Sequence, residues 1–163
     1  MTWLKRILFA LVAVFAVLQF VRPPKNVSNG NVANDINTKF SVPPDVQQIL
    51  QTSCYDCHSN TTRYPWYAEV QPAGWWLNSH IQKAKRGVNF SEFAGYRPRR
   101  QFIKFKQIAD QVSEEEMPLP SYLILHADAK LLPEQRDKLV AWANAMRDTM
   151  KGWYPLDSLE RKK

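Results

Sequence analysis

The sequence predicts an all-α protein. Three observations support this fold class. Apolar side chains recur at helical spacing in several segments, no useful stretch alternates apolar and polar residues as a strand would, and prolines mark helix starts and stops. The 163 residues are 45% hydrophobic, which is enough for one folded domain and an appendage.

The first 21 residues have the layout of an export signal. Lys5 and Arg6 precede an uninterrupted apolar run from Leu8 to Leu18. No pair of small residues suited to cleavage separates this run from Pro23. We therefore expect residues 1–21 to be an uncleaved signal anchor that forms a transmembrane helix, although a cleaved peptide is the alternative.

The rest of the chain divides into three parts. Residues 22–41 are rich in Pro, Asn, Ser and Gly and predict a flexible tether. A helical domain is expected over residues 42–150, and residues 151–163 would form a carboxy-terminal tail.

Four helices are expected in this domain. The first follows Pro43 and Pro44 and leads to Cys54, and the next two are expected at about residues 72–86 and 101–111. The last follows Pro133 and shows the clearest periodicity, through Leu139, Trp142, Ala143, Met146 and Met150.

The charge of the chain is uneven. The net charge is +7, but four basic residues flank the apolar run, and the remainder has 18 basic against 15 acidic residues. This balance argues against a nucleic-acid-binding protein. No pair of residues suggests a general acid–base or nucleophilic site, so we do not expect an enzyme.

The only two cysteines form the motif Cys54-Tyr55-Asp56-Cys57-His58. Cys-x-x-Cys-His is typical of covalent haem c attachment, in which the two thiols bind the haem vinyl groups. His58 would then be the proximal iron ligand. The motif predicts a single covalent haem, and such haem is added outside the bacterial inner membrane. We therefore expect an inner-membrane protein with its haem domain in the periplasm.

Two other interpretations of the cysteine pair are weaker. A redox dithiol usually opens a helix after a strand, whereas this pair follows a helix in a chain without predicted strands. A zinc site needs four ligands, and the spacing to the other histidines matches no common zinc module.

The second axial ligand remains open between several residues. Met117 precedes Pro118 in a proline-constrained loop, which would hold a thioether against the iron. His80 lies on a predicted helix and is the alternative distal ligand, while His126 lies in an apolar stretch and could simply pack. An open sixth position is the remaining possibility.

The chain resembles a known group of proteins. The run from Cys54 to Tyr67 is similar to the bacterial haem-binding-domain family of c-type cytochromes. Five further segments share this similarity: 76–80, 89–92, 116–118, 121–122 and 139–142. The resemblance covers roughly residues 42–148 and implies haem binding. The order of elements also resembles class I cytochromes c, which implies a cytochrome c-like fold and supports Met117 as the axial ligand. The family resemblance includes His80 as well.

Aromatic and basic side chains add two expectations. Trp66 and Trp76 would wall the haem, although a small helical domain also needs bulky core residues. A basic region spans residues 83–106 with Glu92 as its only acidic residue before residue 107. It is a solvated face, a docking surface for an acidic redox partner, or a contact for the haem propionates.

Two functions compete on this evidence. The first is a membrane-anchored monohaem cytochrome that transfers electrons in the periplasm. The second is a haem-based ligand-binding or sensor module with an open or labile sixth iron position. The identity of the residue that closes that position distinguishes them.

Overall fold

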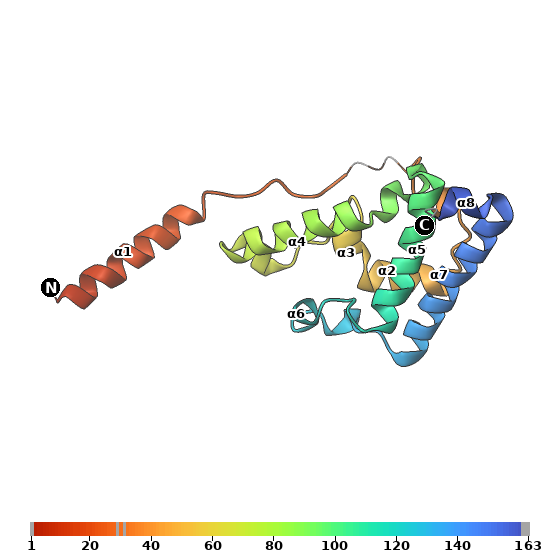
Figure 1. Cartoon of the computed structure of the whole chain (residues 1–163). Helices are drawn as coiled ribbons and strands as arrows, with labels where there is room; N and C mark the ends of the chain where they lie inside the picture. Colours follow the sequence, from red (N-terminus) through yellow and green to blue (C-terminus); the bar gives the residue numbers. More distant parts are fainter. Residues whose placement is uncertain (1, 29, 31, 161–163) are drawn as a thin grey trace.

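A computed structural model describes residues 2–28, 30 and 32–160 and confirms the all-α class. The described residues form helices and no strand (Figure 1). The main helices are α1 (Trp3–Leu18), α2 (Pro44–Ser53), α4 (Ala73–Gly87), α5 (Pro98–Ser113) and α7 (Pro133–Trp153). The short helices are α3 (Tyr55–His58), α6 (Pro120–Leu123), α8 (Leu156–Leu159), η1 (Ile36–Thr38), η2 (Trp66–Glu69), η3 (Phe90–Gly95) and η4 (Ala127–Ala129).

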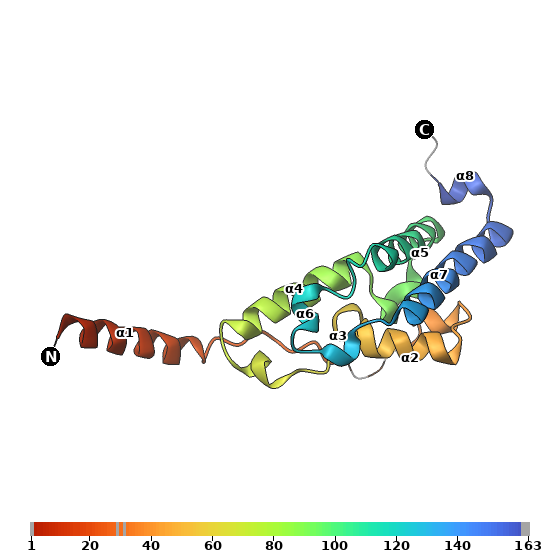
Figure 2. The same ribbon diagram turned by 90° about the horizontal axis from the view of Figure 1, so that it is seen from below.

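Helix α1 projects from the rest of the molecule and buries none of its side chains (Figures 1 and 2). It has 16 residues, fewer than the roughly 20 apolar residues that cross a bilayer. No helix in the described part of the chain combines the length and hydropathy needed to span a membrane. The transmembrane helix expected over residues 1–21 is therefore not found, because the helix ends at Leu18 and includes Lys5 and Arg6.

The segment expected to be a tether makes specific contacts. Arg22 and Lys25 both pair with Glu69, at 2.6 and 2.5 Å. Ile36 and Phe40 are buried in the hydrophobic core. The packed unit therefore includes residues that precede position 42.

Asn26 fixes this segment to the chain that follows the cysteine motif. Its side-chain amide is buried and donates to Ser59 O at 3.0 Å and to Thr62 Oγ1 at 2.9 Å. Its backbone N–H donates to the Tyr64 hydroxyl at 2.6 Å, and Lys85 donates to its side-chain oxygen. A buried amide with all these partners holds the segment in one position.

An aromatic cluster forms the centre of the core, where α5 packs against α7. The Phe105 ring is fully buried, and its centroid lies 4.9 Å from Phe40, 4.8 Å from Phe93 and 5.6 Å from Trp142. These edge and tilted contacts are the geometries that aromatic pairs prefer. The periodic side chains of the last predicted helix face this core, since Leu139, Trp142 and Met150 are buried.

Residues of α8 also pack against the domain. Leu159 of α8 is fully buried. The Arg99 guanidinium donates to Asp157 O at 3.1 Å and to Glu160 O at 2.7 Å. The segment after residue 150 therefore contributes to the core.

We predict that Phe105→Ala lowers the free energy of unfolding by about 3–5 kcal/mol, because it leaves a cavity among buried aromatic rings. Ile103→Ala is the matched control on the same helix, since the Ile103 side chain is 43% exposed. Chemical denaturation of both variants measures the difference. Equal losses of stability in the two variants would contradict this description of the core.

Candidate functional site

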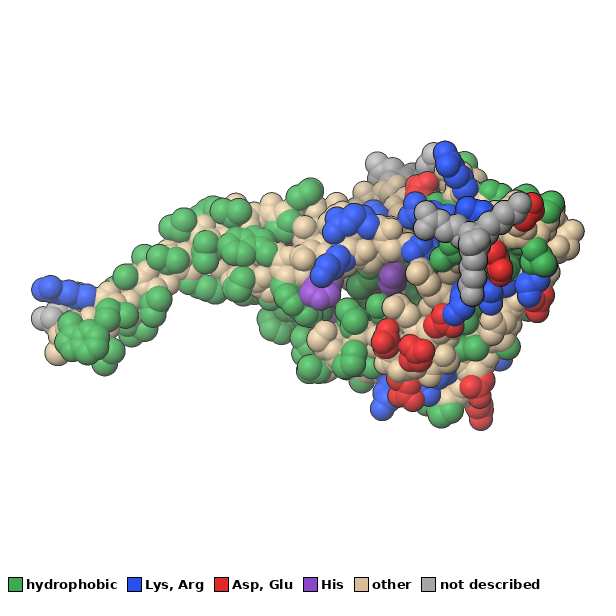
Figure 3. Space-filling view, in the orientation of Figure 1, with side chains coloured by type: hydrophobic (Ala, Val, Ile, Leu, Met, Phe, Trp, Pro, Cys, Tyr) green, Lys and Arg blue, Asp and Glu red, His purple; other side chains and the backbone are tan. Residues whose placement is uncertain are grey.

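A cavity of about 500 Å³ lies between α3, α4, α5 and the loop that leads into α6. Figure 3 shows the hollow between α4 and α6, with His and Lys or Arg side chains gathered on the α4 side. Much of its wall is apolar, contributed by Ala84, Val88, Phe90, Ile108, Val112, Pro118, Leu119 and Leu139. An apolar cavity with a few converging polar groups is the usual form of a cofactor site.

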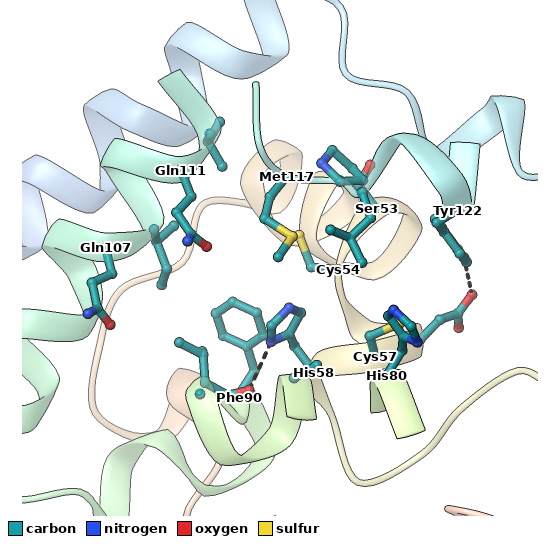
Figure 4. Close-up of a pocket in the computed structure, with 18 of the residues that line it drawn as sticks. Ser53, Cys54, Cys57, His58, His80, Phe90, Gln107, Gln111, Met117 and Tyr122 are labelled. Carbon is teal, nitrogen blue, oxygen red and sulfur yellow. Dashed lines mark hydrogen bonds between the residues drawn. The ribbon is translucent and has the colours of Figure 1, made fainter. Parts of the chain in front are cut away.

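The cysteine motif forms one wall of this cavity. Helix α2 ends at Ser53, and Cys54 departs from helical geometry before the single turn of α3. The backbone N–H groups of Cys57 and His58 both donate to Cys54 O, at 3.1 and 2.9 Å. This turn presents Cys54, Cys57 and His58 together, and all three side chains line the cavity (Figure 4).

Neither cysteine is in a disulfide bond. Burial and the neighbouring Cys57 raise the pKa of Cys54 to about 12. Burial and the charge of Asp56 raise the pKa of Cys57 to about 11. A redox dithiol depends on a lowered thiol pKa, so this environment disfavours the dithiol interpretation.

His58 is oriented by a backbone carbonyl. Its Nδ1 lies 2.9 Å from Val88 O, and a carbonyl can only accept, so Nδ1 carries the proton (Figure 4). Burial lowers the pKa of His58, against the opposing effect of its backbone hydrogen bonds, and favours the neutral ring. The Nε2 lone pair is then available to a metal, which is the usual state of an iron-binding histidine.

Met117 reaches the same cavity from the loop after α5. The backbone N–H groups of Glu116 and Met117 donate to Gln111 O at 2.9 and 3.1 Å, which folds the chain back against the helix end. The Met117 side chain packs on the core and lines the cavity. In Figure 4 it enters the cavity from the loop and is drawn above the His58 ring.

His80 also lines the cavity, from α4. Its Nδ1 donates to Trp76 O, one turn earlier, at 2.9 Å. His126, the third candidate, does not line the cavity. Its Nε2 lies 2.9 Å from the Tyr67 hydroxyl, and its ring stacks on Tyr122 at 4.1 Å. The geometry thus keeps Met117 and His80 as candidates and places His126 in a separate contact.

The two tryptophans expected to wall a haem lie outside the cavity. Trp66 is 78% exposed and packs on Tyr67. Trp76 is 47% exposed, and its ring contacts that of His80, which lines the cavity. The aromatic residues that do line it are Phe90 and Tyr122. The sequence identified both only as parts of the family-like segments. Their position depends on turns that place them against α3.

Asp56 brings a carboxylate to the edge of the site. It forms an ion pair with Arg63 at 3.1 Å and accepts a hydrogen bond from the Tyr122 hydroxyl at 3.0 Å (Figure 4). Burial, with the charge of Asp56, raises the pKa of Tyr122, which remains a neutral donor. The carboxylate is therefore engaged with side chains at the cavity edge.

The residues present fit a haem. Two neighbouring thiols, an imidazole whose Nδ1 is bonded to a carbonyl and a thioether from the loop after α5 line one apolar cavity. They do not fit a zinc site, because no group of three or more His, Cys, Asp or Glu within the described ranges is arranged to hold a metal ion.

Comparison with known proteins agrees with this chemistry. The haem-binding domain family matches residues 13–145, which include every cavity-lining residue named above. No curated protein and no solved structure matches the chain. The match extends over most of the sequence, and the chain belongs to the haem-binding domain family.

Proposed function

We propose that this protein is a c-type cytochrome that carries one covalent haem and transfers electrons in the periplasm. The observation that carries the proposal is the wall formed by Cys54, Cys57 and His58, with Met117 lining the same cavity from the loop after α5. The location follows from the proposed covalent attachment, which takes place outside the bacterial cytoplasm.

The cysteines and His58 have complementary roles in this proposal. Each thiol would add across one vinyl group of the haem, so that a carbon–sulfur bond would form and the thiol proton would pass to the neighbouring carbon. His58 Nε2 binds the iron, while the hydrogen bond from Nδ1 to Val88 O keeps the ring in place. The covalent links hold the cofactor next to this ligand.

Met117 would hold the iron as its second protein ligand. A haem iron supplies reversible one-electron chemistry, and a histidine–methionine pair favours its reduced state and a comparatively high potential. A closed iron changes its geometry little between oxidation states, which suits a carrier of electrons. We therefore assign the protein to electron transfer and not to catalysis.

Met117→Ala should remove the methionine–iron charge-transfer band from the near-infrared spectrum of the oxidised protein. It should also let carbon monoxide bind the reduced iron, because the sixth position is then open. His80→Ala is the control, since His80 lines the same cavity but is not the proposed ligand. A bis-histidine spectrum that His80→Ala abolishes would move the axial role to His80. High-spin iron in the unaltered protein would favour ligand binding or sensing instead.

Replacing both Cys54 and Cys57 by Ser should abolish covalent attachment. The haem of the unaltered protein should survive acidified-solvent extraction and remain with the chain on a denaturing gel, whereas the variant should lose it. Ser53→Ala, which changes another cavity-lining residue, should retain the bound haem. Haem that is extractable from the unaltered protein would refute the c-type assignment.

A further inference from the structure

The corner of the cavity where α4 approaches α5 carries concentrated positive charge. The Arg100 guanidinium donates to Arg86 O at 3.2 Å and joins the end of α4 to the start of α5. Lys83 lies one turn before Arg86, and Lys104 lies one turn after Arg100. Both lysines line the cavity. Because residues three or four apart share a helix face, the two lysines flank the same corner.

No ion pair balances this charge in the described part of the chain. Among the residues that the structure describes, none of these four cations forms an ion pair, whereas Lys106 of the same helix pairs with Asp110. The first turn of α5 contains no acidic residue, and its helix dipole adds positive potential near Arg100.

The charged form of Lys104 is destabilised by this arrangement. Its Nζ donates to the neutral amide oxygen of Gln107 at 2.7 Å. Burial and the charge of Arg100 lower the pKa of Lys104. Of the described residues that line the cavity, Asp56 alone has a carboxylate, and it is engaged with Arg63 and Tyr122. The corner would therefore be stabilised by an anion that enters the cavity.

A haem carries two such anionic groups, the carboxylates of its propionate side chains. Its vinyl groups are on two neighbouring pyrrole rings and its propionates are on the other two, so the propionates leave from the edge opposite the thioether bonds. Gln107, the partner of Lys104, lies across the cavity from Cys57 in Figure 4. We propose that Lys83 and Lys104 bind the haem propionates, an inference that rests on the proposed function.

An acidic partner protein is a weaker explanation of the same charges. Such a partner would meet lysines that project fully into solvent, whereas Lys104 is partly buried and lines the open cavity together with the exposed Lys83. Lysine in a partly buried site forms stronger charge-assisted hydrogen bonds with a carboxylate that is already inside.

The test is the reduction potential of the full-length haem protein with Lys83 and Lys104 both changed to Gln. Loss of two cations beside the propionates should favour the oxidised form about tenfold, which is about 59 mV for a one-electron couple. It should also raise the propionate pKa, so the variant's potential should rise more steeply than the unaltered protein's as the pH falls below neutrality.

Matched variants separate this role from others. Lys106→Gln removes an exposed lysine of the same helix that pairs with Asp110, and it should leave the potential unchanged. Lys83→Arg with Lys104→Arg retains both charges and should restore the pH profile. Covalent haem with an unaltered potential in the double Gln variant would overturn this inference alone.

Two further outcomes are distinct from these. If the double Gln variant keeps its potential but reacts more slowly with an acidic flavodoxin at low salt, the lysines form a docking surface and the propionate role is refuted. If the unaltered chain acquires no covalent haem, the proposed function fails together with this inference.

Discussion

The site depends on the hydrogen bond that His58 donates to the carbonyl of Val88. Helix α4 ends at Gly87, and Val88 has an extended backbone with its N–H bonded to Ala84 O at 2.8 Å. Its carbonyl therefore does not point along the helix axis, and it accepts a hydrogen bond from the His58 side chain. Phe90 lies two residues after Val88. Its ring stacks on the ring of Tyr55, with the centroids 5.4 Å apart, and lies next to the His58 imidazole. One helix end thus sets the ring orientation, the tautomer and part of the cavity wall.

The cavity exists because the core lies to one side of it. The rings around Phe105 fill the space between α5 and α7, while the hydrogen bond from Arg100 to Arg86 O links the end of α4 to the start of α5. Leu139 is fully buried and also lines the cavity, so it belongs to both regions. A filled apolar core with an adjoining apolar cavity suits a domain whose cofactor completes its interior.

The sequence predicted the regular parts of this structure well. Helices expected at about residues 72–86, 101–111 and 133–150 correspond to α4, α5 and α7, because their apolar periodicity and prolines are local signals. The family resemblance also agreed with the family match. Local signals did not reveal that Ile36, Phe40 and Leu159 are buried, since isolated apolar residues in polar segments have no period.

The sequence predicted the chemically reactive residues of the candidate site better than the residues that form the cavity wall. The cysteine motif and the two distal candidates, Met117 and His80, are side chains with recognisable chemistry. The group that accepts the His58 hydrogen bond is a backbone carbonyl. Every residue has such a carbonyl, so the sequence does not single out the partner. Trp66 and Trp76 were expected as haem contacts because of their size, but the turn at η2 and the exposed face of α4 direct them to solvent.

The contacts of Asn26 have a practical consequence for anyone who shortens this protein. A chain trimmed to the helical domain expected from residue 42 onward would lose the amide that joins Ser59 to Thr62, and Thr62 in turn donates to Asp56 O at 2.7 Å. It would also lose Ile36 and Phe40 from the core. A minimal version that keeps the haem motif in its native setting has to begin before Asn26.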